Sequence, residues 1–287
     1  MEAVSPTRSL PEMRIMICSF FIPDKDTQKV INFAFVMKRI CILAAAGMLL
    51  CACSHAQVKE YGIRVVKEYP HETDAYTQGL FFHDGVLYET TGQWGVSSIR
   101  TVDLASGKPL QKKTLNRKYF GEGSVILDGV LYVLTWTNKV AFLYDPATLE
   151  YRRTVSYPRE GWGLTTDGKE LIASDGSATL YFLHPDDLSV RRRLPVSLNG
   201  RPLRNLNELE WIGGKIWANV YLTDMIVIID PESGRVEATV DCKGLLPAAL
   251  RSRETDVLNG IAADAQGRIF LTGKYWPRLY QVELVRR

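Results

Sequence analysis

From Tyr61 to the C-terminus the sequence repeats one short pattern five times. Each copy has a β-rich segment, a turn dipeptide, a second β-rich segment, and an apolar segment that ends in Asp-Pro or a similar pair. The five turns are Asp84-Gly85, Asp128-Gly129, Asp167-Gly168, Gly213-Gly214 and Gln266-Gly267. Successive turn glycines lie 44, 39, 46 and 53 positions apart. Because glycine tolerates the positive φ of primed turns, each dipeptide predicts a tight hairpin.

Further strands complete each copy. The third segments read IRTVDLASG, VAFLYDPATL, LYFLHPDDL, IVIIDPESG and, in the last copy, LYQVEL. The first four copies continue into an outer strand, namely KPLQKKTL, YRRTVSY, VRRRLPV and RVEATVD, which the fifth copy lacks. The segment YGIRVVKEY at residues 61–69 can supply the missing strand and so join the two ends of the chain.

Four strands per unit and a period of about 40 residues are typical of β-propellers. We therefore predict an all-β fold, a five-bladed β-propeller over residues 61–287 that is closed by the N-terminal strand. A β-sandwich also has many short strands, but it does not explain five cycles of turn and Asp-Pro. Helical periodicity is almost absent, and the longest helix candidate, residues 245–253, falls in a connecting loop.

Composition limits the partners. The 287 residues are 46% hydrophobic and 23% charged, which is ordinary for a globular protein. The net charge of +3 argues against a dedicated nucleic-acid or other polyanion binder, so Arg191-Arg192-Arg193 is interpreted as a solvated strand end. Four of the five cysteines precede residue 54 and the fifth is Cys242, so no disulfide framework is predicted.

The start of the chain is predicted to be a targeting segment. From Met37 the run MKRICILAAAGMLLCACS has two basic residues, an apolar stretch too short to span a membrane, and then small residues. This is the layout of a secretory signal. The end of the run also resembles a bacterial lipobox, and we expect Cys53 to be lipidated. The alternative is an ordinary cleavage near Ala52.

These features divide the N-terminal region into three parts. Residues 1–36 are interpreted as an extension from a mis-assigned start, residues 37–53 as a lipoprotein-type signal peptide, and residues 54–60 as a short linker. The predicted location is the bacterial cell envelope, with the exported protein anchored by lipid and facing the periplasm or the exterior.

The active site of a propeller lies at one mouth of its central channel, so each blade is expected to contribute a residue just before its first strand or just after its second. These positions hold Tyr76-Thr77-Gln78-Gly79-Leu80, Gly121-Glu122-Gly123, Gly161-Trp162-Gly163, Leu206-Asn207-Glu208-Leu209-Glu210 and Leu258-Asn259-Gly260-Ile261. A chain that enters a narrow centre needs small residues, which accounts for glycine. It does not account for Glu, Trp and Asn.

Eight strings in this region resemble the landmarks of plant-type glutaminyl cyclases, the glutamine cyclotransferase family. In order they are His71-Glu72 with YTQGL at 76–80, YFGEG at 119–123, LTW at 134–136, GWGL at 161–164, LNELEW at 206–211, WANVY at 217–221, LNGIA at 258–262 and TGKYWP at 272–277. The resemblance extends from about Tyr69 to Glu283. Each string alone is weak, but eight in order at blade spacing are specific.

The resemblance implies an acyltransferase that converts the N-terminal glutamine of peptides and proteins to pyroglutamate and releases ammonia. It implies that Glu122 transfers the proton, while Asn207 and Lys274 bind and polarise the substrate amide. The pocket residues that it implies are Gln78, near the substrate backbone, with Phe120, Trp136, Trp162 and Tyr221. The family resembled here is metal-independent, so no cofactor is expected, and the protein is expected to be a monomer.

The chemistry of cyclisation fits these residue types. The α-amine must attack as the free base, an oxyanion must be stabilised, and the departing ammonia must be protonated. Glu122 stands between two glycines beside Tyr119 and Phe120, and such an apolar setting raises the pKa of a carboxyl group. Lys274 and Asn207 can donate to the oxyanion, and each such donor is commonly worth about 3 kcal/mol. Aromatic walls would exclude water and orient the glutaminyl group.

Simpler interpretations remain open for single residues. Glu122 can be a structural carboxylate that caps backbone N–H groups, and Lys274 by itself would be a solvated lysine. The tryptophans can all be packing residues, and for Trp217, in mid-strand, packing is favoured. Two departures from the family pattern, Tyr221 in place of tryptophan and Thr137-Asn138 in place of a basic residue, are expected to affect substrate preference rather than proton chemistry.

Two other classes of protein compete with the enzyme. A propeller can be a non-catalytic module that binds peptide or glycan at its mouth, because fold does not establish activity. It can also be a vestigial cyclase with an altered pocket. A binding module has no reason to combine Glu122, Asn207 and Lys274, so this combination favours the enzyme.

Metal and nucleophilic chemistry are not indicated. The histidines, His55, His71, His83 and His184, have no paired spacing, and the carboxylates form no calcium-loop pattern. A structural cation in the channel is left open. There is no GxSxG string, and Cys242 has no activating neighbour in the sequence.

Overall fold

The computed structural model describes residues 57–287, which belong to one compact unit, Ala56–Arg287. The predicted extension, signal peptide and lipidated Cys53 lie outside the described residues. Within residues 57–287 the fold is all-β, and the one helical element is a short 3-10 turn at Ala248–Leu250. The helix candidate at 245–253 is therefore mostly loop. No helix in this part of the chain is long and apolar enough to cross a membrane.

Three sheets have four strands each, paired in chain order as antiparallel neighbours. The first contains β2 (Thr77–His83), β3 (Val86–Thr91), β4 (Ser98–Val102) and β5 (Pro109–Thr114). The second contains β6 (Gly121–Leu127), β7 (Val130–Thr135), β8 (Val140–Tyr144) and β9 (Tyr151–Ser156). The third contains β10 (Leu164–Thr166), β11 (Leu171–Ala173), β12 (Thr179–Leu183) and β13 (Val190–Pro195).

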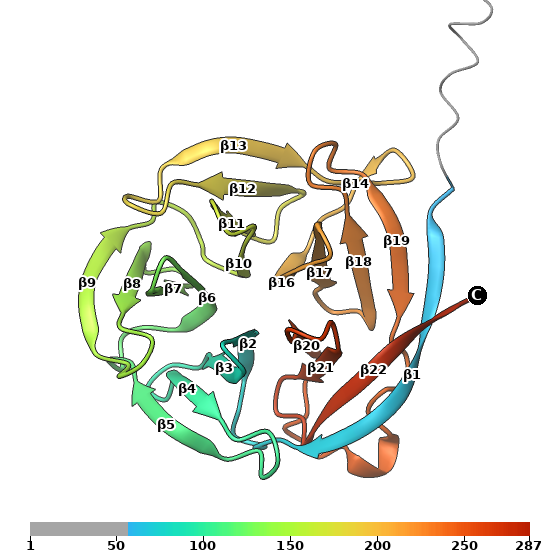
Figure 1. Ribbon diagram of the computed structural model, residues 1–287, viewed down its shortest axis with the longest axis horizontal. Helices are drawn as coiled ribbons and strands as arrows, with labels where there is room; N and C mark the ends of the chain where they lie inside the picture. Colours follow the sequence, from blue (N-terminus) through green and yellow to red (C-terminus); the bar gives the residue numbers. More distant parts are fainter. Residues whose placement is uncertain (1–56) are drawn as a thin grey trace, which may run out of the picture. The chain divides into compact units, whose positions relative to one another are not determined.

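The last two repeats share an eight-stranded sheet. Its order is β16 (Leu206–Ile212), β17 (Lys215–Val220), β18 (Met225–Ile229), β19 (Val236–Asp241), β1 (Lys59–Pro70), β22 (Arg278–Arg286), β21 (Ile269–Gly273) and β20 (Leu258–Ala263). A two-stranded ribbon, β14 (Ser197–Leu198) and β15 (Arg201–Pro202), lies between β13 and β16 in the chain. Figure 1 shows the sheets around a common centre, with β2, β6, β10, β16 and β20 innermost.

Strand β1 supplies the outer strand that the last repeat lacks, as the sequence predicts. It pairs antiparallel with β22 from Tyr61↔Arg286 to Pro70↔Arg278. It begins at Lys59, inside the predicted linker. A short parallel pairing with β19, starting at Lys59↔Ala238, was not expected, and it is what joins two repeats into one sheet.

Three of the five predicted turns are two-residue hairpins. Both central residues have positive φ at Asp84-Gly85, Asp128-Gly129 and Gly213-Gly214, as a primed turn requires. The prediction was wrong for the other two, which are longer loops closed by Thr166↔Leu171 and Ala263↔Ile269. In each of them an aspartate accepts backbone N–H groups and so replaces the tight turn, Asp167 from Lys169 and Glu170, and Asp264 from Gln266 and Arg268.

Apolar residues fill the spaces between neighbouring sheets. Leu134 of the second sheet and Leu171 of the third share one buried cluster, and Phe182 of the third and Ile216 of the fourth repeat share the next. Trp217 is buried in a cluster with β20–β22, so the interpretation of this residue as a packing residue is confirmed. Burial of this apolar surface is the main force that holds the sheets together.

Glycine allows the inner strands to approach closely. A Cβ atom on Gly123 would lie 2.4 Å from the backbone nitrogen of Leu164, and one on Gly163 would lie 2.0 Å from the carbonyl oxygen of Asn207. The Gly123 N–H donates to the carbonyl of Trp162 at 2.7 Å. The glycines next to Glu122 and Trp162 therefore bring three inner strands into contact at the centre.

Candidate active site

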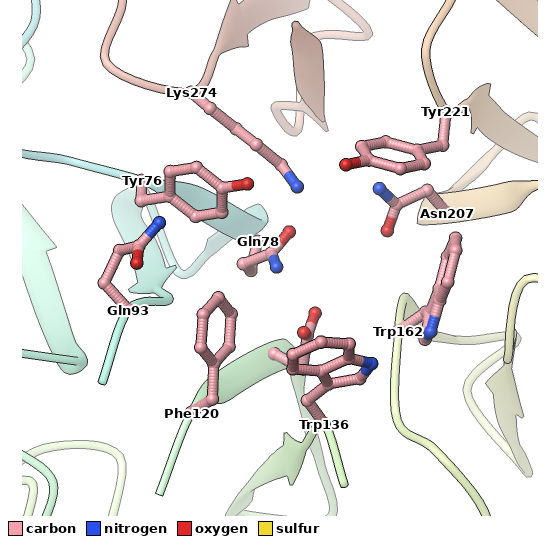
Figure 2. Close-up of a pocket in the computed structure, with 10 residues that line it drawn as sticks. Tyr76, Gln78, Gln93, Phe120, Trp136, Trp162, Asn207, Tyr221 and Lys274 are labelled. Carbon is pink, nitrogen blue, oxygen red and sulfur yellow. The ribbon is translucent and has the colours of Figure 1, made fainter. Parts of the chain in front are cut away.

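One pocket of about 180 Å³ gathers every residue that the sequence singled out for catalysis or substrate binding. Its lining consists of Tyr76, Gln78, Gln93, Phe120, Glu122, Trp136, Trp162, Asn207, Tyr221 and Lys274 (Figure 2). Cavities for drug-sized ligands measure about 300–1,000 Å³. This pocket therefore suits a single amino-acid residue better than an extended peptide.

Irregularities at the starts of the inner strands place three of these side chains. The pairing register shifts between Thr77 and Gly79 in β2, between Gly121 and Ser124 in β6, and between Leu206 and Leu209 in β16. Gln78, Glu122 and Asn207 are the residues within these shifts that line the pocket. A β-bulge bends the strand and redirects a side chain, which explains why the same strand position serves the pocket in three sheets.

The other lining residues lie in the loops at the same end of the sheets. Trp136, Tyr221 and Lys274 directly follow β7, β17 and β21, and Trp162 precedes β10. Several of the predicted positions, before a first strand or after a second strand, thus hold residues that line the pocket, whereas Asn259 at the start of β20 does not. Figure 2 shows Lys274, Tyr221 and Asn207 reaching into the cavity from one side, opposite Phe120 and Trp136.

The carboxyl group of Glu122 is 4% exposed. Burial raises its pKa well above the usual 4.5, the ammonium of Lys274 opposes this shift, and the charge of Glu160 adds to it. The pKa of Glu122 is raised, as the sequence predicts. Of the two aromatic neighbours to which the prediction attributed the shift, only Phe120 lies at the pocket. Phe120 lines the pocket, whereas Tyr119 packs edge-on against Phe142 at 4.7 Å, away from it.

The ammonium of Lys274 lies between two tyrosine rings. Its Nζ atom is 4.5 Å from the ring centroid of Tyr76 and 5.0 Å from that of Tyr221. Burial lowers the pKa of Lys274 to about 8, although the charges of Glu122 and Asp256 oppose the shift. Aromatic faces attract a cation without accepting a conventional hydrogen bond, so the three donors of the ammonium stay available.

Glu122, Asn207 and Lys274 share an unusual property. Each is at most 4% exposed, and within residues 57–287 no protein group forms a hydrogen bond with any of the three side chains. Buried polar groups are normally satisfied by a partner. A carboxylate, an amide and an ammonium directed into one cavity without partners are therefore prepared to bind a polar ligand.

Gln78 differs from these three because it is already held. Its Oε1 atom accepts a hydrogen bond from Nδ2 of Asn259 at 3.2 Å, and the same Asn259 amide donates to the carbonyl of Thr77 at 2.9 Å. Asn259 stands in the LNGIA string at the start of β20 and does not line the pocket. It positions Gln78, which leaves the Gln78 amide nitrogen for a ligand.

Comparison with known proteins shows which family the chain resembles. The sequence profile described as glutamine cyclotransferase matches residues 38–284. The chain is 43% identical over 227 residues to an Arabidopsis thaliana protein named glutaminyl-peptide cyclotransferase, and the match covers 77% of this chain and 71% of that protein. The crystal structure of Myxococcus xanthus glutaminyl cyclase superposes with a TM-score of 0.75 at 37% identity, covering 80% of this chain and all of that one.

The chain belongs to the glutamine cyclotransferase family. Its resemblance to the plant-type cyclases and its prediction as an acyltransferase are thereby confirmed. The alternative of a non-catalytic binding module is not favoured.

Family membership does not explain Tyr221, where the sequence departs from the expected tryptophan. The Tyr221 ring lies against the Lys274 ammonium, which is 5.0 Å from the ring centroid. The same ring packs edge-on against Trp162 at 5.6 Å. The second departure, Thr137-Asn138, does not line the pocket, and Nδ2 of Asn138 donates to the carbonyl of Lys118.

Three residues near the site were not given roles from the sequence. Tyr76 is half-buried, and burial together with the negative charge of Asp256 raises the pKa of its phenol. The Asp256 N–H donates to the carbonyl of Lys274 at 3.0 Å, which ties the 251–257 loop to this lysine. Gln93 has a φ of 92°, a strained value for a residue with a side chain, and such strain is common at functional sites. Of these three residues, only Tyr76 could have been predicted to lie at the pocket, because it stands in the same string as Gln78.

Other candidate groups lie elsewhere. His71 is buried 2.9 Å from the carboxylate of Glu89, and its Nδ1–H donates to the carbonyl of Trp276, so it supports the loop after Lys274 rather than the pocket. Cys242 is 1% exposed in an apolar cluster. In the described part of the chain no three His, Cys, Asp or Glu residues are grouped so that they could hold a metal ion.

Proposed function

We propose that this protein is a glutaminyl-peptide cyclotransferase that converts the N-terminal glutamine of peptides and proteins to pyroglutamate with release of ammonia. One observation carries the proposal. A proton acceptor, Glu122, and two oxyanion donors, Asn207 and Lys274, are buried in one residue-sized cavity, and their side chains form no hydrogen bond with any group of residues 57–287. Family membership supports the same reaction.

The proposed reaction begins with a proton transfer. The α-ammonium of the substrate has an ordinary pKa of about 7.7–8.0, so a carboxylate with a raised pKa can remove its proton at little cost. The free amine then attacks the side-chain amide carbon, and the new C–N bond closes a five-membered ring. The negative charge moves to the amide oxygen, where the ammonium of Lys274 and the amide N–H of Asn207 stabilise it.

The second half returns the proton. The carboxyl group of Glu122 donates to the amide nitrogen, the C–N bond of the original amide breaks, and ammonia leaves. The ring nitrogen gives up its one remaining excess proton to the departing ammonia, which is released as ammonium. Glu122 ends as the carboxylate with which it began, so one group performs both proton steps. The walls of Phe120, Trp136 and Trp162 exclude water and keep the chain folded for ring closure.

The decisive test is Glu122→Gln, which keeps the size of the side chain and removes the proton acceptor. Ammonia release from a Gln-initiated dipeptide is measured for wild type, for Glu122→Gln and for Glu232→Gln, a surface control in the turn between β18 and β19. General acid–base catalysis contributes about 10²–10⁴-fold, and kcat of Glu122→Gln is expected to fall by that amount. Undiminished turnover in a folded Glu122→Gln protein would remove the mechanism.

We also propose that no metal is required. A catalytic metal would stabilise the oxyanion. Lys274 and Asn207 can do this by donating hydrogen bonds, and their side chains already point into the cavity. Activity is expected to be the same before and after exhaustive treatment with a chelator, measured as ammonia release. Activity that disappears with the metal and returns on adding it back would overturn this part of the proposal.

The fold is proposed to be a five-bladed propeller. In support, each of the first three repeats forms a four-stranded sheet, and the eight-stranded sheet divides into β16–β19 and the group β20–β22 with β1. The protein is also proposed to be a monomer. Sedimentation of the active protein would test the monomer.

The location remains a proposal from the sequence. We propose export and lipid attachment at Cys53, with the catalytic unit held at the cell envelope. Intact mass of the exported protein distinguishes a lipidated mature chain that begins at Cys53 from a chain cut near Ala52 without lipid. A mature chain that begins upstream of Cys51 would contradict both.

A further inference from the structure

The indole groups of the two tryptophan walls share a hydrogen-bond acceptor. Nε1 of Trp136 donates to Oε2 of Glu160 at 3.0 Å, and Nε1 of Trp162 donates to the same oxygen at 3.3 Å. In Figure 2 the two indole nitrogens are directed towards the same edge of the pocket. One carboxylate oxygen therefore links a residue that follows β7 to a residue that precedes β10.

The backbone holds Glu160 at this point. The N–H of the next residue, Gly161, donates to the carbonyls of Thr135 and Trp136 at 3.1 and 3.2 Å. A Cβ atom on Gly161 would lie 2.6 Å from Cβ of Leu134, so the close approach requires glycine. The loop that carries Glu160 is thus fixed against the end of β7, and the carboxylate has a defined place beside both indoles.

The two tryptophans need such a link because packing holds them incompletely. Trp136 is 36% exposed; it packs edge-on against Phe120, at 5.6 Å between ring centroids, and in a tilted orientation against the exposed Trp94, at 6.5 Å. Trp162 is half-buried and packs edge-on against Tyr221. A partly exposed indole keeps rotameric freedom unless its N–H is engaged, and charged acceptors bind an N–H more strongly than neutral ones.

The charge of Glu160 is not cancelled by its neighbour in the sequence. The guanidinium of Arg159 lies over the rings of Tyr157 and Tyr181, at 5.3 and 4.4 Å. The negative charge of Glu160 favours the protonated form of Glu122. The positive charge of Lys274 favours the ionised form of Glu122.

We propose that Glu160 is a positioning residue of the active site, which sets the separation of the Trp136 and Trp162 walls by accepting both indole N–H groups at one carboxylate oxygen. This inference rests on the proposed cyclisation in the same pocket. The walls hold the glutaminyl side chain in the ground state and in the transition state alike. Their loosening therefore raises KM more than it lowers kcat.

Three variants test this role in the full chain. Glu160→Ala removes the acceptor, Glu160→Gln keeps an oxygen acceptor of the same reach without charge, and Glu232→Ala is a surface control. With a Gln-initiated dipeptide we expect Glu160→Ala to raise KM about tenfold with a much smaller change in kcat. Glu160→Gln is expected to restore KM to within about threefold of wild type, because neutral acceptors are only modestly weaker.

A spectroscopic measurement separates positioning from general stability. The indole ¹H–¹⁵N resonances of Trp136 and Trp162 are expected to shift and to exchange faster with solvent in Glu160→Ala, and to stay near wild type in Glu160→Gln. The Trp276 indole donates to the carbonyl of Asp256 at 2.9 Å and serves as an internal reference.

The outcomes are distinguishable. Wild-type protein that releases no ammonia from any Gln-initiated peptide would overturn the proposed function, and this role with it. Active wild type with an unchanged Glu160→Ala variant would overturn the role of Glu160 alone. Equal impairment of Glu160→Gln and Glu160→Ala would overturn hydrogen bonding as its basis.

Discussion

At the scale of single residues, Glu122 and Lys274 determine each other's protonation. Burial favours the neutral form of both, and their mutual attraction favours the charged forms. The balance gives a carboxyl group with a raised pKa beside an ammonium with a pKa of about 8. Two groups whose pKa values are moved towards neutrality can exchange protons with a substrate amine and an amide without a large energetic penalty.

The pH dependence of kcat tests the role of the lysine. As the pH rises through about 8, Lys274 loses its proton and the oxyanion loses a donor, so kcat is expected to fall. In Lys274→Arg the guanidinium keeps its proton, because its pKa exceeds about 12. In Lys274→Arg, kcat should therefore no longer fall between about pH 8 and about pH 10. At neutral pH its kcat should be lower than that of wild type, because the donor is displaced. A basic limb that is the same in both proteins would assign it to another group.

At the scale of elements, β16 holds neighbouring strands together through two buried carboxylates. Glu208 accepts the N–H of Leu80 in β2 and the N–H of Ile261 in β20, and Glu210 accepts the N–H of Ala263 in β20. Three inner strands are thereby linked at the centre, next to the pocket residue Asn207. The carboxylates are costly to bury as anions, and burial raises the pKa of Glu210 from 4.5 to about 8.

Glu210 makes stability depend on pH. Below about pH 4 the group is protonated in both the folded and the unfolded chain; above that, only the unfolded chain ionises until the pH reaches about 8. The contribution to the free energy of unfolding is therefore complete below about pH 4 and is lost as the pH rises to about 8. Glu210→Gln, which keeps the acceptor, should match wild type near pH 4 and exceed it near pH 9 in urea unfolding. Glu232→Gln is the control, and an equal difference at both pH values would contradict the expectation.

At the scale of the described unit, β1 connects the first residues of the fold to the last. Its pairing with β22 and β19 leaves neither of those strands with an open edge at that side. The strand also carries Tyr69 into the apolar cluster between the first and last repeats. Closure of this kind removes exposed edges that would otherwise pair with other chains.

Proline in β1 should break this closure. Ile63 pairs with Leu284 in the middle of the β1–β22 ladder. Ile63→Pro removes a backbone donor and is expected to cost about 3 kcal/mol or more, seen as a lower Tm and as concentration-dependent association. Ile63→Val keeps the N–H and should cost about 0.5–1.5 kcal/mol. A Tm for Ile63→Pro equal to that of Ile63→Val would show that closure at this point contributes little.

Local patterns in the sequence were sufficient for much of the fold. Turn glycines, alternating apolar segments and a missing outer strand predicted the hairpins and the role of β1, because these features depend on neighbours in the chain. The two loops at Asp167 and Gln266 escaped prediction, since an aspartate that accepts several N–H groups substitutes for a glycine turn. The parallel β1–β19 pairing had no local signal.

The strings that resemble the family identified the pocket residues, and the position of one residue per inner strand predicted that they would meet. The tertiary structure decided how they act. Register shifts turned Gln78, Glu122 and Asn207 into the cavity, while Tyr119, next to Phe120 in an extended chain, necessarily pointed away.

Groups distant in sequence completed the site. Asp256 reaches Tyr76, and Glu160 holds the Trp136 indole, only because loops of different sheets converge at one end of the sheets. The sequence by itself therefore determined the repeat, the strand pattern and the identity of the polar pocket residues, which are properties of short segments. Protonation states, wall positions and the contact of Tyr221 with Lys274 were decided by the tertiary structure, because burial and long-range charge exist only once the sheets have packed.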